Sequence, residues 1–158
     1  MSNNTTKNNS NDGFLAPDTG RSLPMALLRA REAVMERFRP ILSSHNITEQ
    51  QWRVLRVLDE TGKMEASQVA VRACVLAPSL TRIIKTLECA GLIVSCKDKN
   101  DGRRTLLDID EKGRELIALV SPESGAVYAD IEAVLGHEEV ARLLDILDEL
   151  QKSLKGCR

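Results

Sequence analysis

Aromatic side chains are scarce in this sequence. Only 3% of its 158 residues are aromatic, comprising one Trp, one Tyr and two Phe. Proteins that hold unpaired bases do so on rows of aromatic rings. The sequence therefore argues against a stacking platform for single-stranded nucleic acid, and equally against a sugar cleft lined with aromatic rings.

Long apolar runs and regularly spaced cysteines are also missing. No apolar stretch approaches the roughly 20 residues that a membrane helix needs, and the first residues show no charged segment followed by an apolar one. We therefore expect a cytoplasmic protein. Its four cysteines, Cys74, Cys89, Cys96 and Cys157, match no zinc or redox spacing, so we expect them to stay reduced. Cys74 and Cys89 lie at or near apolar helix faces, which predicts small core residues.

No pattern typical of catalysis is present. The two histidines, His45 and His137, are isolated, and the chain lacks a nucleophile arrangement, a Gly-rich phosphate loop and a metal-binding spacing. The sequence therefore predicts that the protein is not an enzyme and carries no cofactor and no metal.

Charge is unevenly distributed along the chain, although the overall net charge is -1. Residues 72–104 contain seven basic and three acidic residues, a net charge of +4. Residues 108–149 contain three basic and twelve acidic residues, a net charge of -9. One segment can therefore bind a polyanion that the other would repel.

Amphipathic helices are predicted at both ends of the chain. Residues 1–20 are polar and predict a disordered tail. Apolar residues then recur at steps of three and four from Leu23 to Ile41, and again from 140 to 154. Asp110 is expected to cap a helix that begins at Glu111 and is kinked or broken near Pro122 and Gly125.

These terminal helices carry more apolar surface than a monomer of this size can cover. We therefore expect helices at about 22–44 and 111–155 to form a dimerisation domain in a homodimer.

The middle of the chain predicts a compact DNA-binding arrangement. Thr48 and Gln51 form a capping box before one helix, which Gly62 ends. Two shorter helices are predicted at 65–73 and 78–90, followed by two β-prone runs around Asn100-Asp101-Gly102. This order is that of a winged helix-turn-helix, at about 47–110. The fold class is mainly α with a small β-hairpin wing (α+β).

The helix at 78–90 has one apolar and one polar face. Leu80, Ile83, Ile84 and Leu87 share the apolar face. The polar face offers hydrogen-bond donors and cations that can reach base edges and phosphates in the major groove. The wing adds two arginines that suit a narrow minor groove. The predicted DNA-binding residues are Ser79, Thr81, Arg82, Lys85, Arg103 and Arg104.

A second interpretation remains open for this surface. The polar helix face can be an ordinary solvated face, and the basic strip can bind an acidic protein partner. Binding to DNA loses affinity steeply and linearly with the logarithm of salt concentration, which distinguishes the two functions.

Three motifs, PSLTRIIKTLECAGLI, NDGRRTLLDID and EKG, resemble the MarR family of dimeric winged-helix transcription factors. The resemblance runs from about 23 to 154. Asp101 and Arg103 match the family's Asp-x-Arg in the wing. Ile109, Asp110 and Gly113 match its Leu-Thr-x-x-Gly, with Asp in place of Thr. Residues 25–81 further resemble the HpaR-type repressors of homoprotocatechuate and other aromatic-acid breakdown; those relatives keep the helix near Pro122 continuous.

The resemblance implies a homodimer that binds a pseudo-palindromic operator in double-stranded DNA and is released by a small aromatic acid. In relatives that bind such acids, an arginine of the first helix holds the carboxylate, and Arg29 matches that position. We expect the ring to lie near Trp52 and a ring hydroxyl to bond with His45. Alternatively, the arginines of this helix pair with Glu32 and Glu36. A cysteine-based redox sensor is a further alternative, but no cysteine lies near the first helix.

Overall fold

The computed structural model describes residues 22–99, 101 and 103–156. The predicted disordered tail, Cys157 and part of the predicted wing turn lie outside these residues. The chain divides into two compact units, residues 1–37 and residues 38–158.

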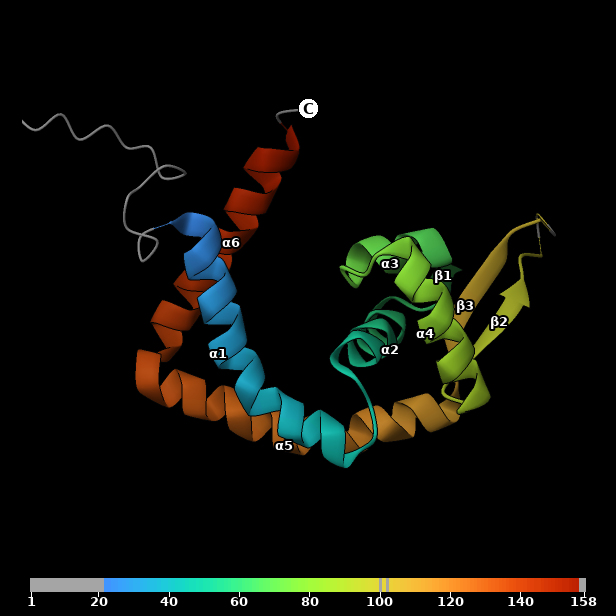
Figure 1. The fold of residues 1–158 in the computed structure, drawn as a ribbon, viewed down its shortest axis with the longest axis horizontal. Helices are drawn as coiled ribbons and strands as arrows, with labels where there is room; N and C mark the ends of the chain where they lie inside the picture. Colours follow the sequence, from blue (N-terminus) through green and yellow to red (C-terminus); the bar gives the residue numbers. More distant parts are fainter. Residues whose placement is uncertain (1–21, 100, 102, 157–158) are drawn as a thin grey trace, which may run out of the picture. The chain divides into compact units, whose positions relative to one another are not determined.

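Helices dominate the described chain, as the sequence predicts (Figure 1). In chain order the elements are α1 (Leu23–Ser44), α2 (Glu49–Thr61), β1 (Met64–Glu65), α3 (Ala66–Arg72), α4 (Ala77–Cys89), β2 (Ile93–Lys97), β3 (Thr105–Ile109), α5 (Glu111–Leu135) and α6 (His137–Gly156). The predicted α+β class and the order of a winged helix-turn-helix are both confirmed.

The small sheet has three antiparallel strands in the order β1-β3-β2. Ile93 pairs with Ile109 across the hairpin, and Met64 pairs with Leu107 on the other side of β3. Strand β1 is missing from the sequence prediction, which begins a helix at Glu65 instead. Two residues are too few to show the alternation that marks a strand, so only pairing with β3 defines it.

The hydrophobic core of the larger unit is formed by α2, α3, α4, the sheet and the first part of α5. Its fully buried large side chains include Leu55, Leu58, Leu87, Ile93 and Leu107. Among the described residues, no polar or charged residue is buried. The apolar face predicted for α4 is confirmed, because Leu80, Ile83 and Leu87 are buried and Ile84 packs against the core.

Helix ends follow the local chemistry of the sequence. Thr48 and Gln51 form the predicted capping box of α2, and Gly62 (φ 75°) ends that helix. Asp110 caps α5 by accepting a hydrogen bond from the Glu111 amide at 2.7 Å. These caps fix where α2 and α5 begin relative to the core.

The turn between α3 and α4 corrects the prediction for Cys74. Its φ is 50°, and the amide of Val75 donates to the carbonyl of Ala70 at 2.9 Å, the pattern of a Schellman motif. Because Cys74 occupies the left-handed position that ends α3, it is exposed rather than in the core. Cys89, at the last position of α4, is exposed as well. The prediction that both are small core residues is wrong.

The sequence predicts a kink or a break near Pro122 and Gly125; helix α5 is continuous from Glu111 to Leu135, so the break is wrong. Proline removes only one backbone donor. The neighbouring turns hold the helix together, because Val120 and Val127 are buried on either side of the proline. Ser121 also donates its hydroxyl to the carbonyl of Ile117 at 2.6 Å.

The last helix differs from the rest of the larger unit. No described side chain after Val127 is buried, and Leu143, Leu144, Ile146 and Leu154 of α6 are exposed. Helix α6 is amphipathic rather than uniformly apolar. No helix within the described part of the chain has the length and apolar character to cross a membrane.

Candidate nucleic-acid interface

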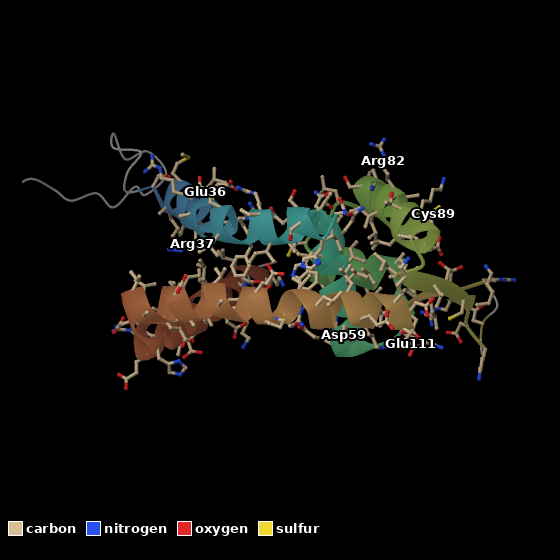
Figure 2. All side chains as sticks on the ribbon, turned by 90° about the horizontal axis from the view of Figure 1, so that it is seen from below. Glu36, Arg37, Asp59, Arg82, Cys89 and Glu111 are labelled. Carbon is tan, nitrogen blue, oxygen red and sulfur yellow. The ribbon has the colours of Figure 1, made fainter. Side chains whose placement is uncertain are left out.

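Helix α4 directs its polar side chains away from the core. Packing of Leu80, Ile83 and Leu87 fixes the rotation of the helix. Thr81, Arg82 and Lys85 are consequently exposed on the other face, and Ser79 is half-buried. Figure 2 shows the Arg82 side chain extending outward from α4. The predicted polar face therefore lies opposite the buried face of α4.

Negative charge is absent from this part of the chain. Residues 66–87, which contain α3, the turn and most of α4, include three basic residues and no acidic residue. Arg72, Arg82 and Lys85 are all exposed. A polyanion approaching this segment would meet these three cations, and the acidic residues next along the chain are Glu65 before α3 and Glu88 in the last turn of α4.

The wing is built on a short network of hydrogen bonds around Asp101. Its side chain accepts from the amide of Arg103 at 3.0 Å, and its carbonyl accepts from the amide of Arg104 at 2.9 Å. The amide of Asp98 closes the loop by donating to the carbonyl of Arg104 at 3.0 Å. Asp101 therefore shapes the backbone from which both arginines project.

The two wing arginines have different surroundings. The Nε of Arg104 lies 2.5 Å from Oε1 of Glu65, the residue that precedes α3. Arg103 is exposed and forms no ion pair with any described residue. Arg103 is therefore available to an external anion, whereas Arg104 attaches the wing to the start of α3. Sequence reasoning treated the pair alike and missed Glu65, which a separation of 39 positions conceals.

The three predicted effector residues have separate environments. Arg29 is exposed on α1, in the smaller unit. In the larger unit, Trp52 is half-buried against the core, and Nε2 of His45 lies 2.8 Å from Oε1 of Glu123 on α5. His45 thus already has an acidic partner, and Glu123 is a neighbour that the sequence did not reveal.

Residues between positions 39 and 49 line a surface groove of about 350 Å³ in the larger unit. It is lined by Arg39, Leu42, Ser43, Asn46, Ile47, Thr48 and Glu49. Nε of Arg39 lies 3.7 Å from Oε2 of Glu49 within this lining. None of the predicted effector residues contributes to the groove.

Possible metal ligands do not gather anywhere in the described residues, where no group of three or more His, Cys, Asp or Glu side chains has the arrangement to hold a metal ion. The chemistry that this surface does offer is electrostatic and hydrogen-bonding. Helices α2, α3 and α4 share a core, an antiparallel hairpin follows α4, and the outer face of α4 carries exposed cations. Together these features define a winged helix-turn-helix protein.

Comparisons with known proteins agree with this class. The sequence profile of the MarR family matches residues 47–105. The HTH-type transcriptional regulator FarR of Neisseria gonorrhoeae is 46% identical over 131 residues, which cover 83% of this chain and 90% of FarR. The chain belongs to the MarR family and is a transcriptional regulator.

Two further relatives support the narrower resemblance. The homoprotocatechuate degradative operon repressor of Escherichia coli is 41% identical over 128 residues, covering 81% of this chain and 86% of the repressor. The crystal structure of NadR in complex with 4-hydroxyphenylacetate has 41% identity and a TM-score of 0.79, covering 87% of this chain and 100% of NadR. The predicted similarity to HpaR-type MarR regulators is confirmed.

Proposed function

We propose that this regulator is a cytoplasmic, homodimeric repressor of an aromatic-acid catabolic operon. Residues 47–110 form its winged DNA-binding domain, and helices at about 22–44 and 111–155 form its dimerisation domain. Each copy places α4 in one half of a pseudo-palindromic operator. A small aromatic carboxylate releases the DNA.

The exposed polar face of α4, with two cations and two hydroxyls, is the observation that carries this proposal. Arg82 and Lys85 supply long cations, and Ser79 and Thr81 supply short hydroxyl donors, from a helix whose rotation the core fixes. A helix of this kind fits the major groove, where cations contact phosphates and shorter side chains contact base edges.

The wing contributes a second contact. The exposed Arg103 side chain inserts into the minor groove, whose negative potential attracts a guanidinium. Arg104 acts chiefly through Glu65, by holding the wing against the start of α3. The wing therefore adds affinity that depends more on groove shape and charge than on particular bases.

DNA binding is tested by fluorescence anisotropy with the duplex upstream of the protein's own gene and with an unrelated duplex. The logarithm of the association constant should fall linearly with the logarithm of the salt concentration, with a slope near -0.9 per phosphate neutralised. Arg82→Ala and Arg103→Ala should each weaken binding, and Arg103→Ala should weaken both duplexes alike. Lys155→Ala on α6 is the control. An interaction module for an acidic protein would show no retention of either duplex.

The relatives also support an aromatic carboxylate as the effector. One represses an operon of homoprotocatechuate degradation, and another is solved with 4-hydroxyphenylacetate. We propose that Arg29 pairs with the carboxylate, that the ring lies near Trp52, and that His45 bonds with a ring hydroxyl in exchange for Glu123. The ligand releases DNA only if it binds the non-DNA-binding conformation more tightly.

The effector is tested by titrating the preformed DNA complex with 4-hydroxyphenylacetate and homoprotocatechuate. A charge-assisted contact contributes about 1.5–3 kcal/mol, so Arg29→Ala should raise the concentration needed for release by roughly 10- to 100-fold. Arg31→Ala, which removes a nearby cation paired with Glu32, should leave release unchanged. Identical curves for the wild type and Arg29→Ala would reject Arg29 as the carboxylate partner.

A further inference from the structure

The first turn of α4 presents apolar side chains to solvent. Leu76, the residue at the N-cap position, is 78% exposed, and Ala77 and Pro78 after it are exposed too. Leu80, one turn further on, is buried. The apolar residues at the start of the helix therefore form a small surface patch that is separate from the core.

Helix chemistry does not account for Leu76. N-cap positions favour Ser, Thr, Asp or Asn, because their side chains accept a hydrogen bond from a free backbone amide. Thr48 and Asp110 make this bond for α2 and α5, whereas Leu76 makes no side-chain cap for α4. Neither helix capping nor burial in the core therefore explains a leucine at this position.

The charges around the patch favour a polyanionic partner. Arg72, Arg82 and Lys85 are exposed on the two helices that meet at this turn, and no acidic residue lies between positions 66 and 87. A second copy of the same surface would bring like charges together. The major groove of DNA instead places phosphates beside base edges, and thymine offers a methyl group there.

We propose that Leu76, with Ala77 and Pro78, recognises thymine methyl groups in the major groove. This inference rests on the proposed DNA binding and adds a source of sequence preference to it. Residues at the start of a recognition helix are the ones that reach base edges. The cationic side chains further along α4 then hold the helix on the phosphates, the hydroxyls contact base edges, and the apolar turn discriminates thymine from other bases.

Replacing thymine by uracil tests this directly, because uracil lacks the methyl group and keeps the same pairing edge. Each thymine of the bound upstream duplex is replaced singly by deoxyuridine, and binding is measured by anisotropy. At the contacted thymines the wild type should bind about fourfold more weakly, as expected for one methyl group returned to water. Leu76→Ala should bind the two duplexes within about twofold of each other.

Two variants separate recognition from structural effects. Val71→Ala removes exposed methyl groups from neighbouring α3 and should keep the full uracil penalty. Leu76→Ser should cap α4, raise the melting temperature by about 2–4 °C and abolish the penalty. A variant that is more stable but has lost thymine preference cannot owe that loss to unfolding.

Several results would overturn the inference. Equal binding of all uracil-substituted duplexes by the wild type, or a full penalty retained by Leu76→Ala, would remove the methyl contact while leaving DNA binding intact. A changed oligomeric state of Leu76→Ala in size-exclusion chromatography would assign the patch to a second copy. Failure of the wild type to bind any duplex would reject the proposed function itself.

Discussion

The winged core, formed by α2, α3, α4, the sheet and the first part of α5, has the same apolar periodicity as helix α6. The two regions use it for different purposes. In α4, residues spaced by three and four positions are buried within the chain. In α6 the same spacing leaves Leu143, Leu144 and Leu154 exposed. A helical apolar stripe therefore shows that a surface is made to be covered, and the rest of the fold determines whether the same chain covers it.

The two halves of α5 also differ in how closely other atoms approach the helix backbone. Near the start of α5, a Cβ on Gly113 would lie 2.3 Å from the carbonyl oxygen of Leu92. Further along the same helix, a Cβ on Gly125 would meet nothing within 4 Å. Gly113 permits α5 to approach the turn residue Leu92 just before β2, whereas Gly125 lies in open surroundings.

Substituting these glycines should give the largest effect on folding. Gly113→Ala should destabilise the protein by about 3 kcal/mol, because the Leu92 backbone and the Ile109 side chain of β3 cannot both move away. Gly125→Ala should stabilise it by about 0.5–1 kcal/mol, since alanine is the better helix former. Urea denaturation measures both. Similar stability for the two variants would mean that the close packing at Gly113 is not required.

A charge placed on α6 should act on assembly rather than on the core. Leu144→Asp should weaken the proposed dimer by about a hundredfold, because the exposed leucine and an unpaired carboxylate would both enter the interface. Multi-angle light scattering should then report the 17.5 kDa mass of one chain instead of twice that value. The far-ultraviolet circular dichroism should stay unchanged. A dimer of unaltered affinity would show that α6 covers its apolar stripe in another way.

Removing a cap in the winged core should have a smaller effect. Thr48→Ala deletes one half of the capping box, in which the Thr48 hydroxyl accepts from the Gln51 amide at 3.2 Å. We expect a loss of about 1 kcal/mol in the free energy of unfolding, with Thr48→Ser retaining most of it. Equal losses for the serine and alanine variants would show that the hydroxyl does not act as the cap.

The smallest effect is expected for an exposed ion pair on α6. Nζ of Lys152 lies 2.5 Å from Oδ2 of Asp148, and this hydrogen bond and charge raise the lysine pKa above its ordinary value. A lysine whose pKa is raised in the folded state stabilises the fold fully at pH values below its ordinary pKa. That stabilisation is lost as the pH rises through the raised pKa. Because the pair is fully exposed, Lys152→Gln should shift the melting temperature at pH 7 by less than about 1 °C. A larger shift would place Lys152 in an interface.

Much of the fold follows from local chemistry, and for that reason the sequence predicted it. Thr48 with Gln51, Asp110 and Gly62 act on backbone groups within a few residues, so their positions define the helix ends without reference to the rest of the chain. The buried face of α4 likewise follows from its spacing. Strand β1 and the continuity of α5 did not, because pairing with β3 and burial on both sides of Pro122 depend on distant residues.

The candidate site shows the same division. The sequence by itself determined that a helix with hydroxyl and cationic side chains precedes a hairpin with two arginines, because residue order and periodicity are local properties. Only the tertiary structure decided that Arg104 pairs with Glu65 while Arg103 stays exposed. It also decided that His45 pairs with Glu123 and that Cys74 is exposed. These outcomes depend on which distant segments the core brings together, and no spacing along the chain encodes that contact directly.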